Sequence, residues 1–195
     1  LWQSLLGSAR KRGEITQDLD SLYAWEPFVV QDRTVNAFAL PGGYIGVHLG
    51  LLAMTATPDE LASVLAHEMS HVTQRHIART IGVQSRQSWV SLASLILGIM
   101  AASRDPAAAQ AVIMGGQAAS MQGQLNFSRD MEREADRVGF GILTTAGFAP
   151  SGMAQMFEHL QMASRLNDDG SYPYLRTHPL TTERIGDARS RLGPN

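Results

Sequence analysis

Hydrophobic residues recur with helical spacing along most of the chain, and only one stretch has the composition of strands. Residues 27–49 are rich in β-branched and aromatic side chains, and Pro41-Gly42-Gly43 interrupts them. This pattern predicts two short strands joined by a turn. Residues 1–26, by contrast, are expected to form an N-terminal helical extension that precedes the strands.

The strongest helix signals stand at residues 57–60. Thr57 suits the N-cap position, Pro58 suits the first helical position, and Glu60 completes a capping box. Hydrophobic residues follow at helical spacing, namely Leu61, Val64, Leu65, Met69 and Val72. We therefore expect one helix over residues 58–80 that ends near Gly82.

The second half of the chain is also predicted to be helical. Helices are expected over residues 128–145, after Pro150-Ser151, and over residues 181–192, with a polar loop at residues 166–178. The expected fold class is therefore α+β and mostly helical, with a small sheet. We expect one domain over residues 1–195, without internal repeats.

Composition and charge narrow the class of protein. Hydrophobic residues make up 44% of the chain, enough for a core. With 16 basic and 18 acidic residues the net charge is −2, so the chain lacks the basic surface that nucleic-acid binding requires. The absence of cysteine excludes disulfides, thiolate nucleophiles and cysteine-type zinc sites.

Residues 86–122 are rich in Ala, Gly, Met and Gln, and their structure is poorly specified. They fit either a lid or helices that pack on the domain or face a membrane. The most hydrophobic part, residues 89–102, would span roughly 21 Å as a helix, less than the ~30 Å core of a bilayer. We therefore expect no transmembrane span and leave peripheral membrane contact open. The chain opens at Leu1, so any signal peptide is already missing.

Residues 67–71 read His-Glu-Met-Ser-His and lie inside the capped helix. Residues four apart on a helix are about 40° apart around its axis, so His67 and His71 can reach one metal ion. Glu68 lies about 60° beyond His71, where a carboxylate can take a proton from activated water. A surface pair of histidines is the plain alternative, but this HExxH pattern favours a zinc peptidase.

Zinc needs a third protein ligand and an open position for water. His76 would lie on the opposite side of the same helix, facing away, which predicts a structural or exposed residue. A carboxylate from residues 128–136 is the better candidate. Glu132 and Asp136 share one face of that helix, so one could bind the metal and the other orient a ligand. Asp130 and Glu134 form a competing pair on another face, and spacing alone does not choose between the pairs.

Four motifs in order resemble the zinc metallopeptidase family of HtpX and the CAAX prenyl proteases, and most closely its soluble periplasmic BepA-like branch. They are HEMSH at 67–71, EREAD at 132–136, NAFALPGGYI at 36–45 and THPLTTERI at 177–185. The resemblance covers roughly residues 30–190. It implies a zincin-like metallopeptidase domain with one Zn²⁺ per chain, held by His67, His71 and Glu132, with Asp136 behind them. The tetratricopeptide repeats of that branch are not present in this chain.

The resemblance also implies a function and a compartment. We expect a zinc-dependent endopeptidase that cleaves unfolded or misassembled proteins in bacterial envelope quality control, in the periplasm. Its partners would be protein or peptide substrates and the outer-membrane assembly machinery. Two other interpretations remain: a latent or non-proteolytic, zinc-bearing, chaperone-like module of outer-membrane assembly, and a structural helical protein with a coincidental HEMSH.

Several further residues have candidate roles. Glu68 is expected to act as the general base and then as the general acid. His178 is a candidate oxyanion donor, a fourth zinc ligand that keeps the enzyme latent, or a structural residue. Arg184 is a weaker candidate that would assist or neutralise nearby carboxylates. His48 and His159 have no partner pattern, which predicts structural or surface residues.

The strand over residues 36–40 is a candidate binding edge for an extended substrate. Main-chain pairing there would bind peptides with little side-chain preference. The alternative is a strand that is fully paired within its own sheet. The residues concerned are Asn36, Ala37, Phe38, Ala39 and Leu40.

Overall fold

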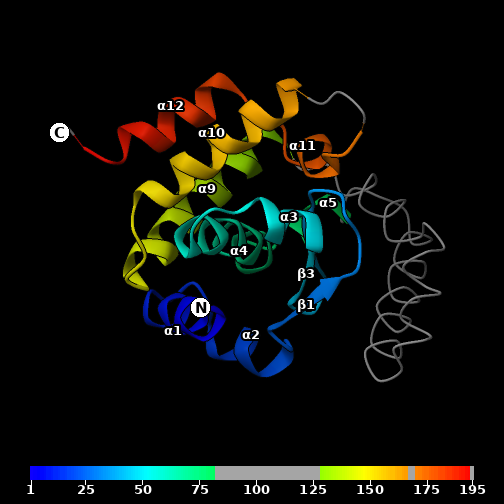
Figure 1. Ribbon diagram of the computed structural model, residues 1–195. Coiled ribbons are helices and arrows are strands. Elements are labelled where there is room, and N and C mark those ends of the chain that lie inside the picture. Colours follow the sequence, from blue (N-terminus) through cyan, green and yellow to red (C-terminus); the bar gives the residue numbers. More distant parts are fainter. Residues whose placement is uncertain (82–127, 167–169, 194–195) are drawn as a thin grey trace.

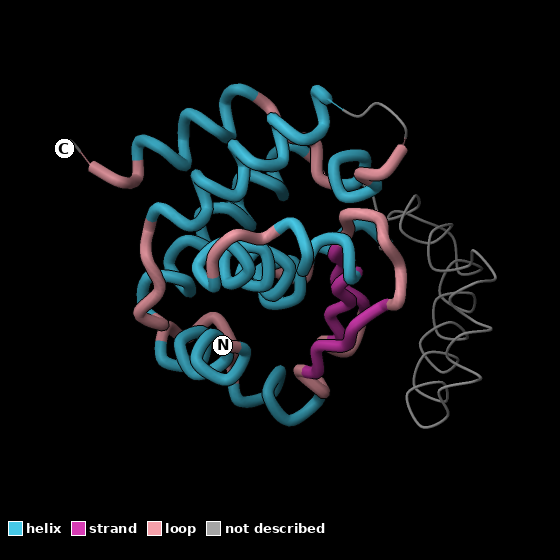
Figure 2. The backbone as a smooth tube through the Cα atoms, in the orientation of Figure 1, coloured by secondary structure: helices cyan, strands magenta, loops and turns pink. Residues whose placement is uncertain are grey.

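The computed structural model describes residues 1–81, 128–166 and 170–193. Figures 1 and 2 show helices around a small sheet, which confirms the expected α+β, mostly helical class. The elements in chain order are α1 (Trp2–Lys11), α2 (Gln17–Leu22), β1 (Glu26–Val30), β2 (Ala37–Leu40), β3 (Tyr44–His48), α3 (Leu49–Met54), α4 (Pro58–Thr73), α5 (His76–Ile81), α9 (Arg129–Thr145), α10 (Ser151–Leu166), α11 (Pro173–Thr177) and α12 (Thr182–Ser190).

The sheet has three strands in the order β1-β3-β2, so the expectation of two strands over residues 27–49 was wrong. β2 and β3 form the expected antiparallel hairpin around Pro41-Gly42-Gly43, where both glycines have positive φ. β1 is an additional strand, and it pairs parallel with β3. It ends where the Asp32 carboxylate accepts a hydrogen bond from the backbone N–H of Thr34 and turns the chain.

Helix α4 lies at the centre of the molecule. It packs against α9, α10, α1 and strand β2, and Figure 1 shows it between the sheet and the surrounding helices. The expected N-cap is present, because Thr57 accepts a hydrogen bond from the Glu60 N–H. The Glu60 carboxylate accepts one from the N–H of Ala56, one residue before the N–H that a capping box uses. Because neighbours surround α4, most of its side chains are buried, including those of the HExxH motif.

The helix expected over residues 58–80 is divided in two. α4 ends at Thr73, Arg75 adopts a left-handed φ of 56°, and α5 begins at His76. This conformation is unfavourable for a residue with a side chain, so the surrounding contacts must hold it in place. Neither glycine nor proline stands at the break to signal it in the sequence.

The later elements follow the sequence more closely. Ser128 caps α9, and Gly147 with a φ of 89° follows its end. The loop expected at residues 166–178 was only partly correct, because Pro173 begins the short helix α11. Residues 86–122 lie outside the described part of the chain. Within that part, no helix is long and apolar enough to cross a membrane.

Candidate metal centre

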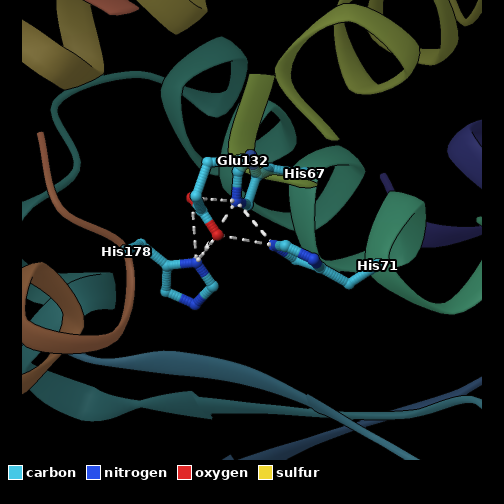
Figure 3. Close-up of side chains that lie close together, drawn as sticks. All are labelled: His67, His71, Glu132 and His178. Atoms are coloured by element: carbon cyan, nitrogen blue, oxygen red, sulfur yellow. Dashed lines mark hydrogen bonds and ion pairs between the residues drawn. The ribbon is translucent and has the colours of Figure 1, made fainter. Parts of the chain in front are cut away.

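His67 and His71 project from one face of α4 toward the same point (Figure 3). Their Nε2 atoms lie 3.0 Å apart, and both side chains are buried. The spacing of four residues on a regular helix produces this arrangement, as the sequence predicted. The buried position excludes the alternative of a surface histidine pair.

Two further segments complete the cluster. Glu132 from α9 places its carboxylate oxygens 3.3 Å from the Nε2 atoms of His67 and of His71. His178, in the turn between α11 and α12, places Nδ1 3.0 Å from Glu132 Oε1 and 3.3 Å from His67 Nε2. One ligand atom from each of these four residues lies within 4.8 Å of the other three.

These distances suit a small tetrahedral ion. Bonds of about 2.0–2.1 Å in tetrahedral geometry separate neighbouring ligand atoms by about 3.3 Å. Most of the contacts in the cluster measure 3.0–3.3 Å. Imidazole and carboxylate donors suit divalent transition metals. The residues present therefore fit a metal ion by both distance and donor chemistry.

The electrostatics of the cluster also favour a cation. Burial disfavours a charged His67, but Glu132 and Asp136 outweigh burial and raise the pKa of His67 to about 10. The imidazoles of His178 and His67 similarly hold the pKa of Glu132 well below its usual range, despite burial. A positive charge is thus stabilised where the donor atoms meet, and a divalent ion would supply it in exchange for the proton.

Asp136 lies directly behind His67. Its Oδ1 accepts a hydrogen bond from His67 Nδ1 at 2.9 Å, which directs the Nε2 lone pair of a neutral His67 into the cluster. Arg184 of α12 donates to both Asp136 oxygens, at 2.7 and 2.8 Å. Although burial opposes ionisation, these hydrogen bonds lower the pKa of Asp136 to about 2. Arg184 also lies 3.0 Å from Glu132, so it neutralises two carboxylates, the weaker role expected for it.

Glu68 is fully buried beside the cluster. Within the described residues neither of its carboxylate oxygens has a hydrogen-bond partner, and His178 Nε2 lies 3.4 Å from Oε1. Burial raises the pKa of Glu68, and the nearby imidazoles of His178 and His67 oppose the shift only in part. A buried carboxylate with a raised pKa and accepting capacity to spare is suited to exchange a proton with a reactant.

The competing acidic pair on α9 takes no direct place in the cluster. Asp130 is on the surface, where it pairs with Arg133. Glu134 Oε2 instead lies 2.9 Å from Nε2 of His76. His76 was expected to face away from the site, and this was wrong: it is fully buried, and its Nδ1 lies 2.8 Å from His71 Nδ1. The break at Arg75 explains the error, because it turns α5 back toward the cluster.

The remaining candidates lie apart from the metal cluster. His48 contacts Thr34 at 2.9 Å, and His159 contacts Glu60 at 3.1 Å. All four side chains of β2 are buried, the strand packs against α4, and β2 is the last strand in the order of the described sheet. Sequence reasoning missed Tyr174, a buried residue of α11. The centroid of its ring lies 4.5 Å from the centroid of the His178 ring. Its position depends on the unpredicted helix α11.

An HExxH helix joined by a glutamate from a second helix defines the class of metal-dependent peptidases. The model of peptidase family M48 matches residues 14–192, and the chain belongs to this family. The family expected from the four motifs is thereby confirmed, and M48 peptidases depend on a metal.

Relatives identify the branch that the chain resembles. It is 41% identical over 167 residues to the beta-barrel assembly-enhancing protease of Yersinia pestis, and 38% identical over 166 residues to that of Escherichia coli K12. Each alignment covers 84% of this chain and 34% of the relative. The mitochondrial metalloendopeptidase OMA1 of Saccharomyces cerevisiae is 30% identical over 190 residues, covering 95% of this chain and 52% of that protein. The chain thus spans about a third of the length of its bacterial relatives.

Proposed function

We propose that this chain is a zinc-dependent endopeptidase that holds one Zn²⁺ through His67, His71 and Glu132. The observation that carries the proposal is the meeting of these three donors, at 3.0–3.3 Å from one another, beside the buried carboxylate of Glu68. Imidazole and carboxylate donors in tetrahedral spacing favour zinc, and a Glu next to the first His is the general base of this arrangement. Asp136 orients His67 from behind.

Glu68 carries the proton through the reaction. When bound, zinc supplies a Lewis acid that polarises a peptide carbonyl and makes water more acidic. Glu68 takes a proton from the attacking water and later delivers it to the leaving amine. Burial raises the pKa of Glu68, which makes its carboxyl group a better proton acceptor than an exposed carboxylate and so suits the first step.

Two of the three candidate roles of His178 have support in the geometry of this site. Its Nδ1 belongs to the group of four donor atoms, which supports a fourth ligand that closes the site and keeps the enzyme latent. Its Nε2 lies 3.4 Å from Glu68, within reach of a reactant, which supports an oxyanion donor once the ring has moved. The four-donor arrangement favours the latent form for the conformation described here.

Substitution of Glu68 tests the proposal directly. Glu68→Gln is expected to keep one zinc per chain and to lose at least 100-fold in cleavage of an unfolded protein such as casein, because general-base catalysis is removed. Metal content by mass spectrometry and a fluorescent cleavage assay measure both outcomes. Undiminished cleavage by the variant would contradict the assignment. Glu132→Ala serves as the companion variant and is expected to lose the zinc itself.

His178→Ala separates the roles of that residue. Faster cleavage identifies a latch, slower cleavage with retained zinc identifies an oxyanion donor, and an unchanged rate assigns the residue a structural role. The three outcomes are exclusive because the substitution removes the ring while the other three donors remain.

We also infer that β2 binds extended substrates through main-chain pairing over residues 36–40. Its packing against α4 supports this, because α4 carries two of the proposed metal ligands. Extended binding requires an unfolded or flexible segment. Reduced, unfolded ribonuclease is therefore expected to be cleaved much faster than its native form, and equal rates would contradict the inference.

The cellular role that we propose is quality control of envelope proteins in the bacterial periplasm, in contact with the outer-membrane assembly machinery. The names of the bacterial relatives, which describe proteases that enhance beta-barrel assembly, support it. A latent or non-proteolytic, chaperone-like module is the second candidate, and the fourth donor His178 favours it. An outer-membrane β-barrel protein, presented unfolded and folded, tests both: cleavage of the unfolded form supports the protease, and binding without cleavage supports the module.

A further inference from the structure

A series of hydrogen bonds leads away from the metal cluster, starting at His71. His71 Nδ1 lies 2.8 Å from His76 Nδ1, and His76 Nε2 lies 2.9 Å from Glu134 Oε2. Arg79 donates to the same Glu134 oxygen at 2.9 Å. Both histidines are fully buried, whereas Glu134 and Arg79 reach the surface. These hydrogen bonds therefore connect His71, a buried residue of the cluster, with an ion pair that solvent can reach.

The Glu134 carboxylate at the end of this series of hydrogen bonds determines which ring nitrogens of His76 and His71 carry protons. Glu134 forms an ion pair with the Arg79 guanidinium at 2.9 Å, so its carboxylate is ionised and can only accept. His76 must then carry its proton on Nε2. Both rings are fully buried, which favours the neutral form of an imidazole. His76 Nδ1 is consequently an acceptor, His71 Nδ1 is the donor, and the lone pair of His71 is left on Nε2, the atom that faces the cluster.

The backbone supports this arrangement at a cost. If α4 continued past Thr73, residue 76 would lie about 180° around the axis from His67 and would face away from the metal. The left-handed Arg75 ends the helix and turns the chain, so that His76 lies behind His71. A strained conformation of this kind persists only where neighbouring contacts compensate for it.

We propose that His76, anchored by Glu134, is a positioning residue that selects the Nδ1–H tautomer of His71 and aims its Nε2 lone pair at the metal. This inference rests on the proposed zinc site. It gives the two histidines of the HExxH motif separate supports from one helix, α9: Asp136 acts on His67 directly, and Glu134 acts on His71 through His76. Within the described residues, His76 adds no donor atom to the group of four.

We call the series of hydrogen bonds from Glu134 through His76 to His71 the relay. Zinc affinity is its first test. His76→Leu keeps the volume but removes the acceptor for His71, and it is expected to weaken zinc binding by about 10- to 100-fold, the effect typical of a lost outer partner. His76→Asn keeps an acceptor oxygen near the position of Nδ1 and is expected to bind zinc more tightly than the Leu variant. Competition with a chromophoric chelator measures all the affinities.

The tautomer of His71 is the second test, and a merely structural role of His76 would not change it. In the metal-free wild type, ¹⁵N NMR of the histidine rings should show His71 protonated on Nδ1, and the Leu variant should show a mixture of tautomers. If His71 keeps the Nδ1–H form in His76→Leu, the relay is wrong. This readout remains informative even when affinities change for another reason.

His159→Leu is the matched control, because His159 also contacts a glutamate, Glu60, but lies outside the cluster. It is expected to leave zinc affinity unchanged, so an equal loss in both variants would overturn the relay. Failure of the proposed function looks different, since the wild type itself would then bind no zinc. If the wild type binds zinc and His76→Leu binds it with the same affinity, the proposed role of His76 is wrong and the zinc site itself is unaffected. If His76→Leu does not fold, comparison of His76→Asn with the wild type still tests the tautomer.

Discussion

Individual carboxylates of α9 have three different tasks, although they lie within five residues of one another. Glu132 contacts both histidines of α4, Asp136 orients His67, and Glu134 reaches His71 through His76. Their contacts differ because the three side chains leave α9 in different directions around its axis. The sequence reduced the choice to two pairs of carboxylates, and the family motif pointed to Glu132 and Asp136.

At the residue scale we predict a large cost for Asp136→Asn. The substitution leaves the buried guanidinium of Arg184 without its doubly bonded partner, and loss of one member of a buried ion pair costs about 3–5 kcal/mol. Because Arg184 keeps its contact with Glu132, the lower end, about 3 kcal/mol, is expected. Urea denaturation of the metal-free protein measures the free energy of unfolding.

Asp130→Asn is the control on the same helix. Asp130 pairs with Arg133 at the surface, where solvent screens the interaction, so the free energy of unfolding should hardly change. An equally small effect of Asp136→Asn would contradict the importance of the buried pair.

Sequence reasoning succeeded at this scale wherever spacing on one helix decides the geometry. His67, Glu68 and His71 needed only the helical repeat. His76 could not be placed, because the left-handed Arg75 separates it from that repeat and a non-glycine residue gives no warning of such a conformation. His178 needed the path of α11, which was expected to be part of a loop.

At the scale of elements, the close packing of α9 on α4 determines whether the donors meet. Gly139 makes this approach possible, because a Cβ atom there would lie 3.1 Å from the backbone nitrogen of His67 and 3.2 Å from the backbone of Ala66. The next turns of α9 toward its N-terminus carry Asp136 and Glu132. The distance between the two helices is therefore linked to the geometry of the metal centre.

We predict that Gly139→Val lowers the free energy of unfolding by about 1–3 kcal/mol through overpacking and also weakens zinc binding. Urea denaturation and chelator competition measure the two effects. Gly186→Val is the matched control: it lies in α12, a Cβ there meets no atom within 4 Å, and a change of no more than about 0.5 kcal/mol is expected. Similar effects at both sites would contradict a special role of the α4–α9 contact.

Elements with local signals were predicted well, and those that depend on distant contacts were not. Capping residues predicted α4 and α9, and the turn with two glycines predicted the β2–β3 hairpin. β1 was missed as a separate strand because its partner, β3, lies beyond an intervening strand, and parallel pairing leaves no turn signal between the two.

At the scale of the whole molecule, the proposed zinc ion joins α4, α9 and the segment before α12. Removal of the metal should therefore lower the stability of the entire fold. At a free zinc concentration of 100 times Kd the ion contributes about 2.7 kcal/mol, which corresponds to roughly 5–10 °C in Tm for a chain of this size. Thermal unfolding with zinc and with a chelator measures the difference. Glu132→Ala should abolish the dependence on zinc, and an equal Tm of the wild type in both conditions would contradict the proposed site.

The segments that carry the residues of the metal cluster are synthesised at widely separated times. His67 and His178 are 111 residues apart in the chain, and Glu132 lies between them. During translation, α4 emerges from the ribosome long before the turn that carries His178, and the cluster closes only after that last segment has folded back. Under the proposed activity, a half-made copy holds two histidines but no complete centre. The proposed three-donor centre therefore cannot form before α9 is made, and His178, the donor that would close it, is the last to arrive.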